Sequence, residues 1–231
     1  MIPIHLFRGY VAPYLEQAIF CEVVFSTYIF WAFGATSGCH LTLISVDRFL
    51  AICYPLFHKE YWNKKGNSMV CITVAYLIGF GLSVSWMLLC YRMKDGICSF
   101  NDDFFERWRF YIGFHQFFID FCVPTFTMTL LYSLIYMSLA KRSMKNSKSS
   151  SKRTNAVIRT ALVTAFTYIV CVSPNKIMWM LHCIRVSEVS FEEWPIYATH
   201  VLVALNSCCN PIIYTFSINV FKKELLKLLK C

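Results

Sequence analysis

Five long apolar stretches are the feature that most constrains how this chain can fold. Each is close to or above the ~20 residues that an α-helix needs to cross a bilayer, and none alternates apolar and polar residues as the strands of a membrane barrel do. Only 15% of the residues are charged, against about 25% in a soluble domain. The sequence therefore predicts one all-α domain over 1–231, a polytopic membrane helix bundle with transmembrane spans at approximately 20–45, 69–89, 110–139, 157–183 and 194–216.

The distribution of charge predicts the orientation of these helices. Lysine and arginine follow the first and third stretches and recur in the tail, as Lys64, Lys145 and Lys222 illustrate. Acidic residues such as Asp102 and Glu192 lie in the other two connections. Because basic segments stay in the cytoplasm, we expect a multi-pass plasma-membrane protein with its N-terminus outside and its C-terminus inside. The net charge of +9 then reflects basic residues that lie beside the membrane spans and set their orientation. Nucleic acid is therefore not an expected partner.

Two segments outside the stretches have distinctive compositions. Leucines and lysines alternate over 219–230, which predicts a short amphipathic helix lying on the lipids of the inner leaflet. Cys231 follows it, and both palmitoylation and a free terminal thiol are open. The Ser/Lys/Asn-rich linker at 141–154 is either a solvated connector near anionic headgroups or a partner-binding or phosphorylated loop.

Polar motifs close the first and the last stretch, at the ends expected to face the cytoplasm. The first ends with Asp47 and Arg48, and the last contains Asn210 and Pro211. Polar groups inside a membrane are costly unless they have a role. A charged pair that breaks and re-forms as helices move suits a conformational switch, although a snorkelling interfacial Arg is the plainer interpretation of Arg48 alone. Pro211 frees a backbone carbonyl and permits a kink in its helix.

These motifs, taken together, resemble those of rhodopsin-like (class A) G-protein-coupled receptors. The segment 45–56 (SVDRFLAICYPL) resembles the exit of the family's third helix, and 205–214 (LNSCCNPIIY) resembles its seventh. The prolines and tyrosines typical of the fifth and sixth helices lie between them at Pro124, Tyr132, Tyr168 and Pro174. The resemblance covers essentially the whole chain and implies a seven-helix receptor whose first two helices have no counterpart here. Loss of upstream sequence and a real five-helix isoform are both open.

The resemblance implies roles for residues along the inner half of the bundle. Those implied in G-protein coupling and switching are Asp47, Arg48, Leu56, Tyr132, Asn210, Pro211 and Tyr214, with Tyr168 and Pro174 as the switch of the sixth helix. Heterotrimeric G protein is thus an expected partner. A sodium ion is the one cofactor that the family suggests, and its site is incomplete because the second-helix Asp is missing. The remaining side of that site is Ser37, Asn206 and Asn210.

The resemblance also places a ligand cavity in the outer half of the bundle. Phe30 stands where amine receptors carry an Asp, and Ala204 stands where opsins carry a Lys, so neither an amine contact nor retinal attachment is expected. Charges inside a membrane are usually paired. Asp120 and Lys176 are expected to form an ion pair, to make two contacts to a zwitterionic ligand, or to form a purely structural salt bridge. The expected pocket residues are Phe30, Gln116, Asp120, Asn175, Lys176 and His200.

The acidic outer loops and the run at 205–211 (LNSCCNP) resemble those of peptide and neuropeptide receptors. A cationic peptide would suit acidic loops electrostatically, and a small polar or amine molecule is the alternative ligand. The family's outer disulfide is matched by Cys21 and Cys98, with Cys90 as a rival partner. Membrane lipids and a second receptor chain are further expected partners.

Other functional classes have less support in the sequence. No internal repeat of the kind found in transporters is visible. Cys39 and His40 adjoin, but neighbours on a helix point about 100° apart and do not make a catalytic dyad, so an enzyme is not expected. No metal site is expected either. The remaining alternative is a non-signalling truncated isoform that acts by hetero-oligomerisation with complete receptors.

Overall fold

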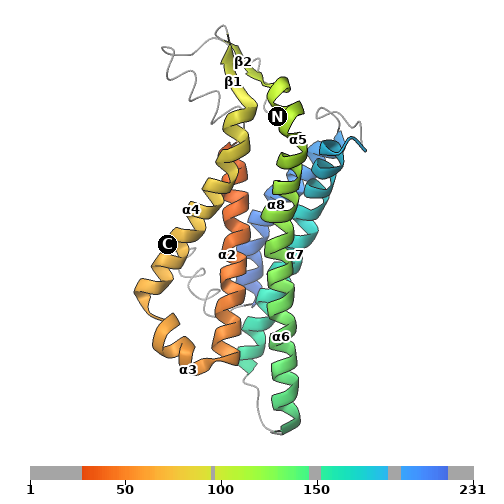
Figure 1. Cartoon of the computed structure of the whole chain (residues 1–231). Helices are drawn as coiled ribbons and strands as arrows, with labels where there is room; N and C mark the ends of the chain where they lie inside the picture. The colour runs from red at the N-terminus through yellow and green to blue at the C-terminus, as the bar shows by residue number, and fades with distance from the viewer. Residues whose placement is uncertain (1–27, 95–96, 146–151, 187–193, 218–231) are drawn as a thin grey trace, which may run out of the picture.

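The computed structural model describes residues 28–94, 97–145, 152–186 and 194–217, which form an elongated helix bundle (Figure 1). Within these described residues, five helical segments are long and apolar enough to cross a membrane, which confirms the predicted fold. The predicted tail helix at 219–230, Cys21 and Cys231 lie outside the described residues. In chain order the elements are α2 (Tyr28–Cys53), α3 (Pro55–Phe57), η3 (His58–Trp62), α4 (Lys65–Cys90), β1 (Tyr91–Lys94), β2 (Ile97–Phe100), α5 (Asp102–Phe114), η4 (His115–Cys122), α6 (Val123–Lys145), α7 (Lys152–Cys183) and α8 (Trp194–Ser217).

Several helices extend past the predicted apolar stretches at their inner ends, α2 and α6 by the most residues. α2 continues to Cys53, beyond the predicted span limit at 45, and α6 continues to Lys145, beyond 139. Hydropathy detects only the part of a helix that lies in lipid, whereas backbone hydrogen bonding continues wherever the chain stays helical. The third stretch is one helical run of α5, η4 and α6, in which η4 is a π-helix of eight residues.

A β-hairpin caps the bundle between α4 and α5, and the sequence analysis did not predict it (Figure 1). β1 and β2 pair antiparallel, with Tyr91 opposite Phe100 and Lys94 opposite Ile97. The two strands are separated in the sequence by Asp95-Gly96, a dipeptide that strongly favours a two-residue hairpin turn. The turn signal was therefore present in the sequence, in the connection between the second and third apolar stretches.

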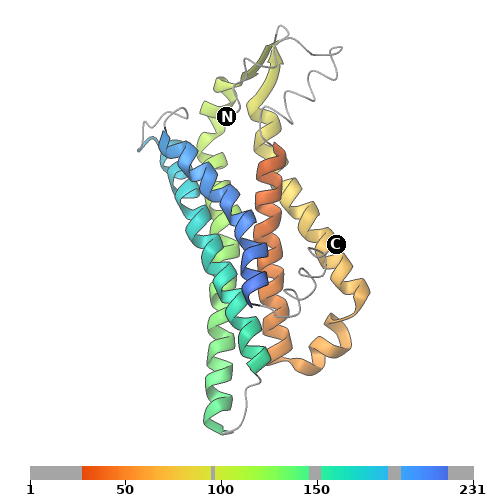
Figure 2. The same cartoon turned by 180° about the vertical axis from the view of Figure 1, so that it is seen from behind.

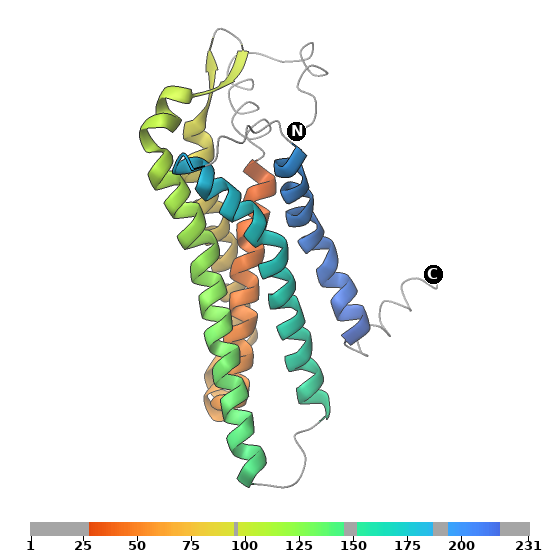
Figure 3. The ribbon, with the colours of Figure 1, turned by 90° about the vertical axis from the view of Figure 1, so that its right-hand side faces the viewer.

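The helices pack around α2, which contacts α4, α6, α7 and α8. Figure 2 shows α8 beside both α7 and α2, and Figure 3 shows α8 from the side, with α5, η4 and α6 as one long rod. α2 and α4 approach closely at Gly79, where an added Cβ would lie 2.6 Å from the Thr36 backbone. Small residues are what allow membrane helices to come this close.

The core lies between α2, η4, α6 and α7. Its buried side chains include Leu41, Phe121, Met128 and Tyr168. Large apolar residues on the outer faces, among them Leu77, Phe126 and Phe166, are exposed. Apolar side chains on an outer face are stable in contact with lipid tails. Their exposure therefore agrees with a membrane protein whose packed interior is small.

Candidate functional site

A cavity of about 150 Å³ lies between α2, η4, α7 and α8. Buried charged and amide side chains share it with aromatic rings, which is typical of a binding site rather than of an apolar core. Four residues predicted for the ligand pocket line it: Phe30, Gln116, Asp120 and Lys176. Asn206, predicted for the sodium site, lines it as well.

Asp120 and Lys176 form the charged centre of this cavity, as one of the predicted arrangements requires. Lys176 Nζ lies 3.7 Å from Asp120 Oδ2, and the two side chains are only 9% and 6% exposed. This distance is longer than the ~2.7–2.9 Å of a charge-assisted hydrogen bond. Asp120 Oδ1 is buried and has no hydrogen-bond partner among the described residues. An acceptor left in this condition costs free energy until a donor reaches it.

Two neighbours of the ion pair were missed by the sequence analysis. His115 Nδ1 lies 3.9 Å from Asp120 Oδ1. These residues are five apart, a separation that an α-helix does not bring to one face but that a π-helix, with its i→i+5 bonds, does. Trp31 places its ring 5.6 Å from Lys176 Nζ, within reach of a cation–π contact. The aromatic run around Phe30 was the only sequence signal for Trp31.

Two other predicted pocket residues are not among those that line the cavity. Asn175 is buried, and its Nδ2 donates to Thr199 Oγ1 at 3.1 Å, so its side chain joins α7 to α8. His200 lies behind Trp31, with ring centroids 5.4 Å apart in an edge-on arrangement. These two residues were predicted to line the cavity because of their helical positions. A helical position indicates only the approximate face on which a residue lies, whereas the bonding partner decides the direction of its side chain.

Asn206 and Asn210, two of the residues predicted for the remnant of a sodium site, both lie on α8. The Oδ1 atoms of Asn206 and Asn210 are buried and have no hydrogen-bond partner in the described part of the chain. Residues four apart on a helix share a face, and amide oxygens are ligands that hard cations accept. Ser37 is half-buried on α2. Two orphan amide oxygens fit a monovalent cation in their chemistry, but they supply no carboxylate charge.

Tyr168 connects the cavity to the core below it. Its ring is buried, and its hydroxyl donates to the backbone carbonyl of Asp120 at 3.3 Å. The hydroxyl packs against Gly38, where an added Cβ would lie only 2.8 Å away. Pro174 lies inside α7, two turns nearer the outer end, where its missing N–H removes one helical bond. A movement of η4 at Asp120 would therefore be transmitted to α7.

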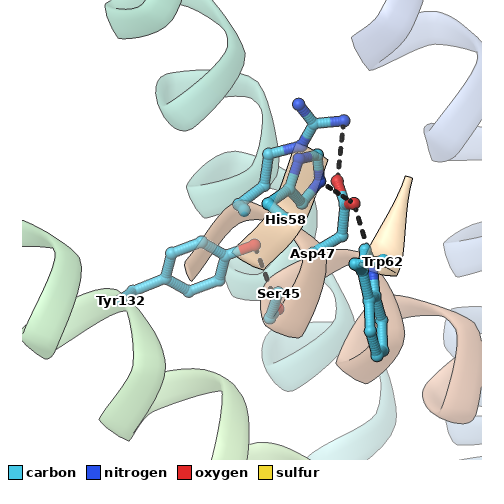
Figure 4. Close-up of polar contacts among 6 residues, drawn as sticks. Ser45, Asp47, His58, Trp62 and Tyr132 are labelled. Carbon is cyan, nitrogen blue, oxygen red and sulfur yellow. Dashed lines mark hydrogen bonds and ion pairs between the residues drawn. The ribbon is translucent and has the colours of Figure 1, made fainter. Parts of the chain in front are cut away.

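The inner end of α2 contains the predicted Asp47–Arg48 pair, drawn in Figure 4. Arg48 Nη2 lies 3.2 Å from Asp47 Oδ2, and the Arg48 side chain is 39% exposed. The same carboxylate contacts His58 and Trp62 of η3, which the sequence analysis did not single out. Leu56 on α3 is 74% exposed. An apolar side chain in this position is open to contact from outside the bundle.

The remaining predicted switch residues lie on α6 and α8. Tyr132 is buried, and its Oη shares a hydrogen bond of 3.0 Å with Ser45 Oγ, which ties α6 to α2 (Figure 4). Pro211 lies inside α8 next to Asn210. Only the backbone is described for Tyr214 and for Cys98, so the side chain of the predicted switch residue Tyr214 and the predicted disulfide lie outside the described side chains.

Sequence comparison gives the family. A family model described as 7 transmembrane receptor (rhodopsin family) matches residues 7–214. The chain belongs to this family. Membership confirms the resemblance found in the motifs and makes the chain a multi-pass membrane protein of a receptor family and not an enzyme.

Individual relatives in this receptor family are distant. The chain is 27% identical to Proteinase-activated receptor 1 of Xenopus laevis over 219 residues, which cover 91% of this chain and 50% of that receptor. It is 23% identical to Lysophosphatidic acid receptor 4 of Homo sapiens, and equally to that of Mus musculus, over 96% of this chain and 62% of those receptors. The chain thus spans half to about three-fifths of the length of these curated relatives.

Proposed function

We propose that this protein is a receptor that converts the binding of an extracellular ligand into activation of a heterotrimeric G protein. The observation that carries the proposal is the buried Asp120–Lys176 pair lining a cavity in the outer half of the bundle. Buried charges in a membrane protein are costly. A pair with one unsatisfied carboxylate oxygen is better suited to exchange partners with a ligand than to hold two helices together.

The chemistry of the cavity favours a ligand with groups of both signs. Asp120 Oδ1 accepts a donor, and Lys176 can donate to a carboxylate or carbonyl. Phe30 and Trp31 supply aromatic surface. A peptide has a charged terminus, carbonyls and aromatic side chains, and we infer that one end of it enters a cavity of about 150 Å³. A small polar molecule is the alternative, because a cavity of this size can hold one entirely.

The same geometry suggests how binding reaches the cytoplasm. A ligand that contacts Asp120 better in one arrangement of η4 than in another shifts the population toward that arrangement. Tyr168 bonds to the Asp120 carbonyl and packs on α2 at Gly38, so the shift involves α7 and α2 together. At the inner end of α2, separation of Arg48 from Asp47 frees the guanidinium for a G protein.

The wider setting follows from the charge distribution. We infer a plasma-membrane location with the C-terminus in the cytoplasm, a disulfide between Cys21 and Cys98, and palmitoylation of Cys231. A sodium ion on the amide oxygens of Asn206, which lines the cavity, and Asn210 is proposed as a cofactor.

The signalling proposal is tested by expressing the complete transcript in cells that carry a G-protein activation reporter. Arg48→Ala is expected to change basal or ligand-evoked activation, while Glu106→Gln, an exposed outer residue that does not line the cavity, is the control. Surface expression is matched by antibody labelling. A receptor that reaches the surface but activates no G-protein class, with or without Arg48, would support the alternative of a non-signalling isoform acting through receptor dimers.

The ligand role is tested separately with the double variant Asp120→Asn with Lys176→Met, which removes both charges and leaves neither unpaired. We expect it to fold and to lose its response to peptides, small polar molecules or lysophosphatidic acid, whichever activates the unmodified receptor. A response of unchanged potency would show that the ion pair is structural. A response to lysophosphatidic acid alone would replace the peptide in this proposal with an anionic lipid.

A further inference from the structure

The Asp47 carboxylate receives donors from two different elements (Figure 4). Arg48 Nη2, on the same helix, lies 3.2 Å from Oδ2. His58 Nε2 lies 2.9 Å from Oδ1, and Trp62 Nε1 donates to the same oxygen at 3.1 Å. An ionised carboxylate only accepts, so His58 Nε2 carries the proton in this contact. One carboxylate therefore joins α2 to the connection that leads to α4.

The burial of this connection shows which of its residues are anchors. Across 54–62 every residue is exposed except His58 and Trp62, which are half-buried. They are the first and last residues of η3, four apart, and so lie on one face of the segment. The side chains between them point to solvent. The connection is thus docked on α2 mainly through the two residues that bond to Asp47.

The two loop contacts also change what happens when Arg48 leaves. A partly buried carboxylate that loses its last donor bears the full cost of desolvation. Asp47 is 29% exposed and keeps two donors on Oδ1 when the Arg48 contact on Oδ2 is broken. The energetic barrier to separating Arg48 from Asp47 is therefore lower than in a helix end where the two residues have only each other.

We propose that His58 and Trp62 hold Asp47 independently of Arg48, so that Arg48 can be released while the cytoplasmic connection stays docked on α2. They are positioning residues, and their effect on signalling rests on the function proposed above. Leu56 lies on α3, the short helix that leads directly into η3, and is exposed, so the same contacts keep an apolar side chain in place for a cytoplasmic partner.

The docking can be tested without a signalling readout. The full chain is purified in lipid nanodiscs with 5-fluorotryptophan at all tryptophans, and Trp62→Phe assigns the Trp62 fluorine resonance. Arg48→Ala is expected to leave this resonance in place, whereas Asp47→Ala is expected to move it. A resonance that moves equally in both variants would overturn the proposal, because Arg48 would then be needed to hold the connection.

The effect on coupling is tested at equal surface expression in the receptor made from the complete transcript. Trp62→Phe and His58→Leu are each expected to lower G-protein activation roughly 3- to 10-fold, which corresponds to the loss of one typical hydrogen bond of about 1 kcal/mol. His58→Gln keeps a donor and is expected to restore most of the activity. Tyr61→Phe, which changes a neighbouring ring without a contact to Asp47, is the matched control.

A double variant separates this role from a general loss of structure. With Asp47→Ala already present, Trp62→Phe is expected to lower activation no further, since the acceptor is gone. An equal further loss in that background would show that Trp62 acts elsewhere and would contradict the proposal. A receptor that activates no G protein in any form would refute the proposed function, while the fluorine experiment would still decide the docking.

Discussion

Gly38→Ala is the substitution for which the structure gives the most specific expectation. An added Cβ on α2 would lie 2.8 Å from Tyr168 Oη and 3.3 Å from Tyr168 Cζ, closer than carbon and oxygen normally pack. The ring is buried in the core, so it cannot swing into solvent. The hydroxyl must move, and its bond to the Asp120 carbonyl is then lost.

The magnitude follows from three contributions to the free energy of unfolding. Overpacking a well-filled site costs about 1–3 kcal/mol, and the lost hydrogen bond costs about 1 kcal/mol. Alanine in place of glycine inside a helix returns about 1 kcal/mol. The net expectation for Gly38→Ala is a destabilisation of about 1–3 kcal/mol. At about 2–4 °C per kcal/mol for a chain of this size, the unfolding temperature falls by roughly 2–12 °C.

The assay is thermal unfolding of the purified protein in detergent micelles. Gly34→Ala on the same helix, where nothing lies within 4 Å of the added Cβ, is the matched control and is expected to be neutral or slightly stabilising. Tyr168→Phe removes the closest atom, so Gly38→Ala should cost little in that background. If Gly38→Ala and Gly34→Ala unfold at the same temperature, the close approach of α2 and α7 at Tyr168 is wrong.

The same unfolding assay checks three further expectations. Gly79→Ala brings a Cβ against the backbone of α2 and should cost more than about 3 kcal/mol, because a backbone cannot rotate away; a neutral result would contradict the α2–α4 packing. Lys176→Met leaves the buried Asp120 carboxylate without its cation and should lower the free energy of unfolding by about 3–5 kcal/mol. Adding Asp120→Asn should restore most of this loss. If it restores none, the two side chains are not coupled. Ser45→Ala should lower the free energy of unfolding by about 1 kcal/mol, and by much less once Tyr132→Phe is present. Equal losses in the two backgrounds would mean that the Ser45–Tyr132 hydrogen bond does not form.

Part of the candidate site could be predicted because membrane burial makes polar residues conspicuous. Asp120 and Lys176 lie in long apolar stretches, and the cost of an unpaired charge made an ion pair between them one of the expected arrangements; the structure places the two side chains 3.7 Å apart. Asp47 and Arg48 are adjacent in the sequence, so their pairing needed no tertiary information. The hairpin, by contrast, had a readable signal in Asp95-Gly96 and was overlooked.

Other contacts could not be predicted from an α-helical projection. His115 reaches Asp120 because η4 is a π-helix, which changes the residues that share a face. Asn175 was expected in the cavity and bonds instead to Thr199 on α8, since a buried amide takes whichever partner the neighbouring helix offers. No sequence pattern singled out His58 and Trp62, and only the fold brings them into contact with Asp47.

The sequence alone determined that this chain is a membrane helix bundle and to which receptor family its motifs point, and its charges predict how the helices are oriented. These properties depend on hydropathy, charge and short motifs, which act within one helix at a time. The tertiary structure decided which polar side chains share the cavity, where Tyr168 finds room on Gly38, and how three donors converge on Asp47. Such contacts depend on distances of a few ångströms between helices far apart in the chain, and only close packing sets those distances.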